Sequence, residues 1–256
     1  DPDLESIQLD PQQTRIDAKV GLLDPFAGVE KLTLRAGHND YEHNELSADG
    51  PGTKFTNRGI EARLEAVHAP VFDWQGAVGV QFVDRDFEAI GAETFVPPTA
   101  ISDRGLFIVE QREFAPFKVE VGARRDLREL DARDGTSVAR GATSLSASAA
   151  WQFATGWSAT VNLDRAARAP GEEELFANGA HDATGSFEVG DPQLRVEVAN
   201  QVELGLAYES AAVQARAGVY RNRFDRFIYL AETGLVDPDE GLPIRPDPGI
   251  WWKIVA

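Results

Sequence analysis

The sequence predicts an all-β fold, specifically an antiparallel up-and-down transmembrane β-barrel segment of about ten strands. Three observations lead to this class. Apolar and polar residues alternate over long segments, a period of two that suits a strand and cannot form one face of a helix. Short and long connections alternate between these segments. No apolar run approaches the roughly 18–20 residues that a membrane-spanning helix needs.

Composition narrows the protein class further. The chain has 256 residues, of which 43% are hydrophobic and 26% charged, a globular rather than a disordered balance. Lys and Arg number 25 against 42 Asp and Glu, so 25 − 42 gives −17 and argues against nucleic acid or an anionic lipid surface as the main partner. The absence of Cys excludes disulfides, thiolate metal sites and cysteine nucleophiles. Without Met or a signal peptide, and beginning at Asp1, the sequence is expected to be an excised piece of a longer one.

The expected strands follow one another along the chain, each with one apolar row. The first three carry the rows Ile16, Ala18, Val20, Leu22; then Leu32, Leu34, Ala36; then Ile60, Ala62, Leu64, Ala66. The next three carry Trp74, Val78, Val80, Phe82; a less regular stretch at 106–109; and Phe117, Val119, Val121, Ala123. The last four carry Leu145, Ala147, Ala149, Trp151, Phe153; Trp157, Ala159, Val161, Leu163; Val202, Leu204, Leu206, Tyr208; and Val213, Ala215, Ala217, Val219. Their lengths are near the roughly 9–11 residues of a membrane-crossing strand, rather than the 5–6 of a soluble one.

The connections between these strands differ systematically in length. Short turns are expected at 24–28, 69–73, 115–116, 154–156 and 210–212. Longer polar loops are expected at 40–54, 88–102, 129–140, 167–195 and from residue 231 onward. An outer-membrane barrel has this asymmetry, with tight turns on one rim and long loops on the other, whereas a Greek-key sandwich has no reason for it.

The two faces of the expected strands agree with a membrane barrel. The apolar rows suit lipid, and Trp74, Phe117 and Trp157 lie beside short turns, where an aromatic girdle is expected. The opposite rows are rich in Arg, Glu, Lys, Ser, Thr, Gln and Gly, which suits a wet lumen. The alternative is a soluble meander or two-sheet domain whose polar rows face solvent.

Residues 165–194 read RAARAPGEEELFANGAHDATGSFEVGDPQL, and this stretch resembles the barrel of TonB-dependent outer-membrane receptors. The continuation at 200–205 and 219–229 is similar to the next two strands of that family. Segments 37–43 and 176–191 are most similar to the zinc-uptake branch of the family.

The resemblance implies that residues 1–256 form part of a receptor barrel in the outer membrane of a Gram-negative bacterium. Such receptors are barrels of about 22 strands with a plugged lumen, so the chain corresponds to about half, the C-terminal half. No plug domain or TonB box is recognised, so coupling to the TonB system is expected only through a missing plug, and transport by this chain alone is not expected. Residues 241–256 depart from the family pattern, because closely spaced prolines do not suit a central strand, and they suggest a truncated or frameshifted tail.

The residues that could bind a metal are few. His181 lies in a polar run and could ligate Zn²⁺ through an imidazole nitrogen, or it could be a solvated loop histidine. Glu42 and His43, with His38, Asp40 and Glu45 nearby, could supply further ligands from one loop, or they could form a wet acidic loop. The resemblance to the zinc-uptake branch implies that His181 and Glu42 or His43 share a zinc site across the barrel mouth. His68, beside a short turn, is expected to be an interfacial bystander.

These observations leave a binding and transport module as the expected function. Its partners would be outer-membrane lipid and zinc or a metal chelate, with Zn²⁺ as transported ligand rather than a required cofactor. No GxGxxG, P-loop, HExxH or GxSxG motif occurs, so no enzymatic activity is expected. The alternative function is an independent small outer-membrane β-barrel with a structural or adhesive role.

Overall fold

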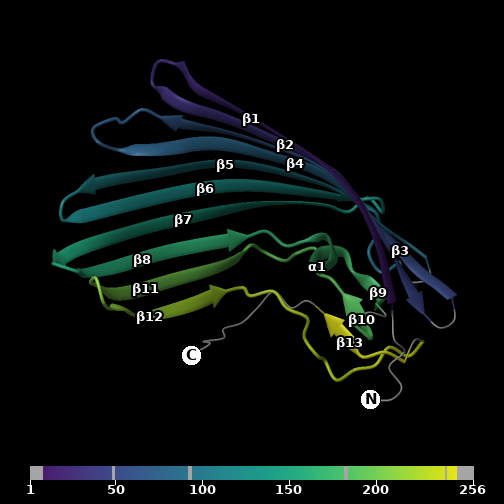
Figure 1. The fold of residues 1–256 in the computed structure, drawn as a ribbon. Helices are drawn as coiled ribbons and strands as arrows, with labels where there is room; N and C mark the ends of the chain where they lie inside the picture. The colour runs from purple at the N-terminus through teal and green to yellow at the C-terminus, as the bar shows by residue number, and fades with distance from the viewer. Residues whose placement is uncertain (1–7, 48–49, 92–93, 182–183, 240, 247–256) are drawn as a thin grey trace.

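The predicted sheet is present in the computed structural model, which describes residues 8–47, 50–91, 94–181, 184–239 and 241–246. Ten long strands form one antiparallel sheet in which almost every strand pairs with its neighbours in the chain (Figure 1). The strands are β1 (Gln8–Phe26), β2 (Val29–Ser47), β3 (Gly50–His68), β4 (Gln75–Ile90), β5 (Thr99–Phe114), β6 (Phe117–Ala132), β7 (Ser137–Ala154), β8 (Trp157–Arg168), β11 (Glu197–Glu209) and β12 (Gln214–Asp225). The all-β, up-and-down class is therefore confirmed.

The sheet is strongly curved but open. Its order runs β1-β2-β3-β4-β5-β6-β7-β8-β11-β12, so that β1 and β12 are its two edges and do not pair with each other in the described residues. The alternative of a small barrel closed by these ten strands alone is therefore not adopted. An open edge leaves a row of backbone N–H and C=O groups unpaired, which is the arrangement of part of a larger sheet.

The strands are longer than the sequence pattern predicts, because they extend far beyond the apolar rows. β1, β2 and β3 each have 19 residues, and the segments expected as loops at 40–54 and 129–140 are largely strand, whereas the expected loop at 88–102 is present between Ile90 and Thr99. The loop prediction was wrong for 40–54 and 129–140 for a physical reason. Backbone hydrogen bonds between neighbouring strands continue where side-chain alternation ends, since pairing does not require an apolar face. The predicted short turns are confirmed, with β5 and β6 joined through Ala115 and Pro116 alone.

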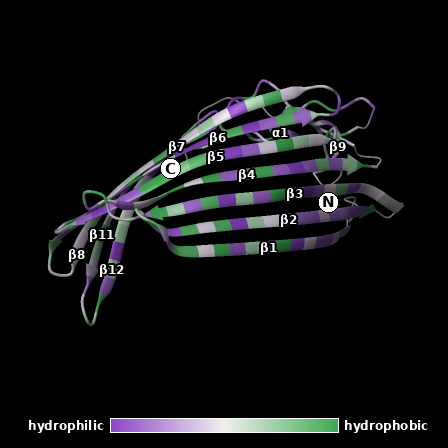
Figure 2. Cartoon of the chain, turned by 90° about the horizontal axis from the view of Figure 1, so that it is seen from above, coloured by the Kyte–Doolittle hydropathy of each residue, from purple (hydrophilic) through white to green (hydrophobic). Residues whose placement is uncertain are grey.

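The outer face of the sheet is apolar near the short turns. Alternating hydrophobic and hydrophilic bands run along the strands in Figure 2. Large apolar side chains of the outer rows stand exposed, among them Ile16, Leu64, Leu106, Leu163 and Leu204. Rings line this face beside the short turns, with adjacent centroids 4.8–6.3 Å apart, through Phe114, Phe117, Trp151, Phe153, Trp157 and Tyr208. This row confirms the aromatic girdle expected at Phe117 and Trp157.

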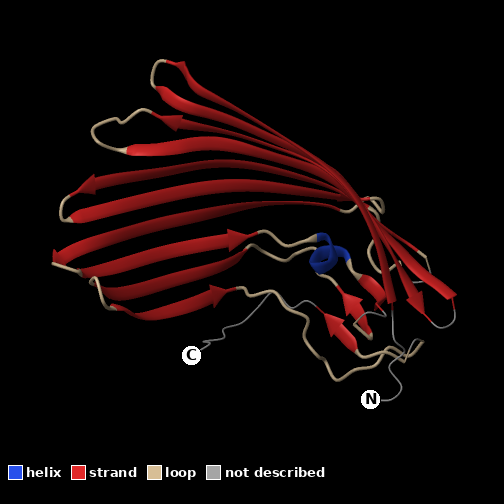
Figure 3. Ribbon diagram, in the orientation of Figure 1, coloured by secondary structure: helices blue, strands red, loops and turns tan. Residues whose placement is uncertain are grey.

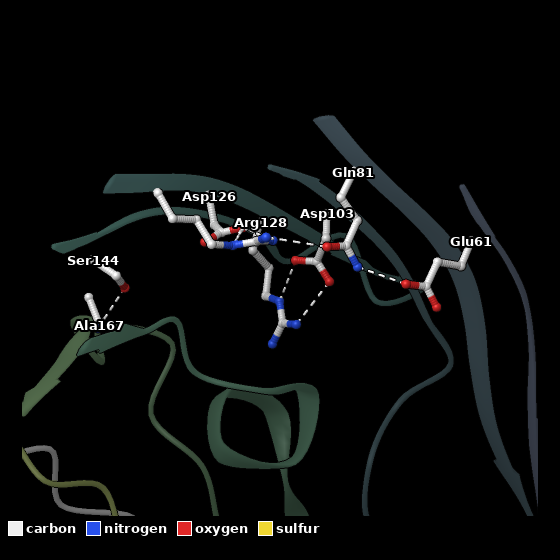
Figure 4. A network of polar contacts seen from close by, with 8 residues as sticks. Glu61, Gln81, Asp103, Asp126, Arg128, Ser144 and Ala167 are labelled. Carbon is white, nitrogen blue, oxygen red and sulfur yellow. Dashed lines mark hydrogen bonds and ion pairs between the residues drawn. The ribbon is translucent and has the colours of Figure 1, made fainter. Parts of the chain in front are cut away.

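The inner face carries ion pairs between residues two apart on one strand. On this face the described residues include three such pairs with N–O distances of 2.6–2.9 Å: Arg15–Asp17, Arg63–Glu65 and Arg124–Asp126. Residues i and i+2 of a strand share a face, so this spacing pairs charges along a polar wall. Figure 4 shows how Gln81 extends the network, accepting from Arg124 at 3.3 Å and donating to Glu61 at 2.7 Å. The polar row predicted for a lumen is thus an interconnected surface.

The buried core lies on the concave side of the sheet, against a segment inserted between β8 and β11. This segment contains α1 (Glu172–Phe176), β9 (Asn178–His181) and β10 (Ser186–Val189) (Figures 1 and 3). Strand β13 (Ile244–Pro246) pairs parallel with β10, which completes a small sheet in the order β13-β10-β9. Core residues come from both layers: Phe55, Phe87, Phe95, Val96, Ile101, Leu130, Leu175, Phe176, Leu194 and Ile228.

Two expectations are affected by this inner layer. Residues 167–195 were expected to be one polar loop, which is wrong, because buried Leu175 and Phe176 anchor the segment to the sheet. Of the expected atypical tail, Ile244–Pro246 form β13, which lies at an edge of the small sheet, where proline is tolerated. Residues 247–256 lie outside the described residues, so a truncated or frameshifted tail stays a prediction. No helix in the described ranges is both long and apolar enough to cross a membrane.

Candidate functional site

His181 is held at the end of β9 by a carboxylate from β10. Its Nδ1 donates to Glu188 Oε1 at 2.9 Å, and the Thr184 hydroxyl donates to the same oxygen at 2.7 Å. Burial by itself would lower the pKa of His181, but the hydrogen bond and charge of Glu188 outweigh it, so the pKa of His181 is raised. Burial would likewise raise the pKa of Glu188, yet His181 and Thr184 hold it below its ordinary value. The pair is therefore an oriented histidine–carboxylate contact in which Nδ1 faces Glu188.

Aromatic rings connect His181 to His43 of β2. His181 stacks on Phe95 with ring centroids 4.2 Å apart and an interplanar angle of 16°. His43 stacks on Phe55 at 4.7 Å and 11°, and the Phe55 ring lies 6.2 Å from Phe95 and 6.5 Å from His181. We call His43, Phe55, Phe95 and His181 the histidine–aromatic cluster. It brings together two of the three residues that the sequence singled out.

Two polar atoms near this cluster are buried without a partner in the described residues, His43 Nδ1 and Glu45 Oε2. Glu45 is only 5% exposed, and its charge contributes to the raised pKa of His181. Buried polar atoms normally find a partner, so these two atoms are candidates for contact with a bound group. Sequence reasoning mentioned Glu45 only as part of an acidic loop, because its burial depends on packing.

Glu42 is not part of the cluster. It lies in β2 rather than in a loop, and strand alternation places it on the face opposite His43. There its carboxylate pairs with Lys54 at 2.7 Å, and the neighbouring Asp40 pairs with Arg58 at 2.8 Å. The structure therefore brings His43 and His181 together but separates Glu42 from both. Within the described parts of the chain, no group of three or more His, Asp or Glu residues is arranged to hold a metal ion.

The glutamates of α1 attach the inserted segment to the barrel wall. Glu172 is buried and accepts from Arg85 of β4 at 2.8 Å. Glu174 accepts from Arg168 at 2.8 Å and from the backbone N–H of Gly171 at 2.7 Å. A run of three acidic residues such as 172–174 usually forms a solvated surface, but Glu172 is buried. The sequence alone does not show that Glu172 has an arginine partner, because the positions of the inner-face arginines such as Arg85 are known only once the strands are paired.

Comparison with known proteins identifies the family. The sequence model described as "TonB dependent receptor-like, beta-barrel" matches residues 10–248, which is nearly the whole chain. The chain belongs to the TonB-dependent receptor β-barrel family.

Solved structures with the same fold have little sequence identity to this TonB-dependent receptor barrel. The copper transporter OprC superposes with a TM-score of 0.75 at 16% identity, over 92% of this chain and 41% of that one. The Serratia marcescens hemophore receptor HasR, solved with its hemophore and heme, gives 0.74 at 15%, over 94% and 44%. The FrpB iron transporter from Neisseria meningitidis gives 0.70 at 16%, over 94% and 39%. The chain thus spans about two fifths of the length of these structures.

Membership in the TonB-dependent receptor family indicates the location of the barrel. Receptors of this family are outer-membrane proteins of Gram-negative bacteria, where we expect the apolar outer rows to face lipid and the ion-paired rows to face the lumen. The histidine–aromatic cluster then lies on the luminal side, because His181 belongs to β9 of the inserted segment and His43 of β2 lies opposite Phe55 of β3 on the inner face. The family and the matched structures are receptors and transporters rather than enzymes.

Proposed function

We infer that the chain is the barrel part of a receptor for TonB-dependent uptake of a metal ion or metal chelate, with zinc as the favoured metal. The observation that carries this proposal is the His181–Glu188 pair within the histidine–aromatic cluster. A histidine that ligates a metal commonly donates its other ring N–H to a carboxylate, which fixes the ring orientation. With Nδ1 bound to Glu188, His181 has Nε2 as its ligand atom.

We propose His181 and His43 as the two imidazole ligands of this chain, with Glu45 contributing buried negative charge nearby rather than a ligand atom. Imidazole nitrogen and carboxylate oxygen are competent zinc ligands, whereas Glu42 on the outer face cannot join them. A closed tetrahedral zinc site needs about four ligands, so this set is partial. We propose that a plug domain outside this chain supplies the rest and couples the receptor to TonB. The chain alone would then bind zinc weakly and would not transport it.

The proposal can be tested by zinc calorimetry on the complete receptor that contains this barrel. We expect His181→Ala to weaken zinc binding by tenfold or more, whereas His38→Ala, which removes an exposed outer-face imidazole, leaves it unchanged. A change within about threefold (roughly 0.7 kcal/mol) for His181→Ala would remove the site from the proposal and leave only the barrel.

The matched transporters favour a second cargo within the same proposal. One is named for copper and another for iron, and imidazole sites bind Cu²⁺ more tightly than Zn²⁺. Competition between Zn²⁺ and Cu²⁺ at the same site, or with a preformed iron chelate, would separate these cargoes. If the receptor bound the iron chelate and free Zn²⁺ or Cu²⁺ did not compete with it, chelate uptake would replace zinc uptake as the proposed function.

A further inference from the structure

Four ionisable side chains interrupt the apolar outer face beside the short turns of β3, β4 and β5. They are His68, Asp73, Glu110 and Arg112. Glu110 and Arg112 lie directly opposite Val121 and Val119 of β6, which belong to the lipid-facing row. Charged groups are costly on a lipid-facing surface, so an ionisable cluster there calls for a partner.

A glycine allows two of these residues to meet across an intervening strand. The His68 Nε2 atom lies 2.9 Å and 3.0 Å from the two carboxylate oxygens of Glu110, although β4 lies between their strands. Gly76 of β4 occupies the gap, where a Cβ would lie 2.7 Å from the Glu110 carboxyl carbon. The other ring nitrogen of His68 lies 2.8 Å from the Ala69 carbonyl oxygen. Since both ring nitrogens face acceptors, the ring is arranged as an imidazolium cation.

The second ion pair, between Arg112 and Asp73, keeps part of its charged surface accessible to a ligand. Arg112 Nη2 donates to Asp73 Oδ2 at 3.0 Å. Arg112 Nε is buried and has no partner in the described residues, and the Asp73 side chain is 78% exposed. The Arg112 side chain as a whole is 36% exposed, so a partly accessible guanidinium lies beside an accessible carboxylate.

The surroundings of these pairs match the headgroup level of a bilayer. Phe72, in the adjoining turn, is 88% exposed, and neighbouring Val71 is 55% exposed. The Arg112 guanidinium lies 5.7 Å from the centre of the Phe114 ring, which belongs to the aromatic row. Aromatic side chains gather where hydrocarbon meets headgroups, and exposed phenylalanine in a turn is favourable there rather than in water.

We propose that His68, Asp73, Glu110 and Arg112 bind the headgroup of a zwitterionic, amine-bearing phospholipid. The lipid phosphate accepts from the guanidinium of Arg112, whose side chain is 36% exposed, and the lipid ammonium donates to Asp73. The charges of the cluster, two positive and two negative, sum to zero. Each cation lies beside an anion, as the ammonium and the phosphate do in such a headgroup. An anionic headgroup would bring net negative charge beside Asp73 and Glu110 with no cation left unpaired, so it is disfavoured.

Lipid retention measured by native mass spectrometry tests this proposal on the full chain purified in detergent. Delipidated protein is incubated separately with phosphatidylethanolamine, phosphatidylcholine and phosphatidylglycerol. We expect phosphatidylethanolamine to be retained at least about fivefold more than the other two, because phosphatidylcholine lacks ammonium N–H donors and phosphatidylglycerol is anionic. Equal retention of all three lipids on the unmodified chain would overturn the proposal without any variant.

Two variants and a control locate the site. Arg112→Gln and Asp73→Asn should each reduce phosphatidylethanolamine retention to the level of phosphatidylglycerol, and Asp73 lies in an exposed turn where substitution leaves the strands intact. Arg125→Gln removes an outer-face arginine that donates to Thr143 at 2.8 Å, away from the cluster, and should have no effect. Unchanged phosphatidylethanolamine retention in Arg112→Gln and Asp73→Asn would contradict the site. Zinc binding is measured separately, because the outer cluster does not contact the proposed zinc ligands.

Discussion

The His181 imidazole donates to the Glu188 carboxylate at 2.9 Å, and this contact joins β9 to β10 on the luminal side of the barrel wall. Both side chains are largely buried, with exposed fractions of 17% and 6%. Because the two side chains stabilise each other, the stability of the inserted segment depends on pH, and the sign of this dependence follows from the directions of their pKa shifts.

The protection of the inserted segment should be greatest between about pH 4.5 and 6.5. The pKa of His181 is raised above 6.5, so its contribution is complete below 6.5 and is lost as pH rises through the raised value. The pKa of Glu188 is lowered from 4.5, so its contribution is complete above 4.5 and is lost as pH falls through the lowered value. Hydrogen exchange of residues 178–181 and 186–189 across this range would measure both limbs. Glu188→Gln should flatten the profile, and a flat profile in the unmodified chain would contradict the pairing.

Arginine at a lipid-facing position should destabilise the barrel far more than arginine on the luminal face. We expect Ala149→Arg or Leu204→Arg to cost about 2–4 kcal/mol of unfolding free energy in a bilayer, since both side chains lie in outer rows. Their strand neighbours Ser148 and Glu203 face the lumen, where the same substitution should be nearly neutral. Denaturant titrations in lipid vesicles would compare the pairs, and equal costs on both faces would show that the assignment of faces is wrong.

Loss of the Glu172 carboxylate should release the inserted segment from the wall. Glu172→Gln leaves Arg85 without its carboxylate, which should weaken docking by about 1–3 kcal/mol. Limited proteolysis within residues 169–195 would detect the release. Glu173→Gln, which changes an exposed side chain of the same helix, serves as the control. Equal cleavage of the two variants would mean that the ion pair does not anchor α1.

Gly76→Ala should separate His68 from Glu110. The new Cβ would lie 2.7 Å from the Glu110 carboxyl carbon and closer still to the Val109 carbonyl oxygen, so the strand or the side chain must shift. We expect a loss of about 1–3 kcal/mol in unfolding free energy. Gly21→Ala is the matched control, because a Cβ there meets no atom within 4 Å. A similar midpoint of urea unfolding for both variants would contradict the structural role of Gly76.

The amino-acid sequence predicted the sheet because its signals are local. An alternation such as Ile16, Ala18 and Val20 against Arg15, Asp17 and Lys19 assigns each side chain to a face without reference to any other segment. Short turns were predictable for the same reason. The strand ends were not, because main-chain pairing of β2 with β3 extends through segment 40–54, where the side chains no longer alternate.

Only part of the candidate site could be predicted from the sequence. His181 and His43 were singled out, but the partner of His181 was not, since Glu188 comes into reach only when β9 and β10 pair. Glu42 was grouped with His43 because adjacent residues of a loop can point the same way. In a strand they point to opposite faces, and Glu42 lies on the outer one.

The chain by itself therefore determined the strand order, the two faces and the family. Only the tertiary structure decided which distant side chains meet. The curved sheet and the inserted segment bring His43 and His181 to the same rings, and the gap at Gly76 lets His68 reach Glu110 across a strand. Periodicity is a property of neighbours along one strand, whereas these contacts depend on register between strands and on packing between layers, which no single segment encodes.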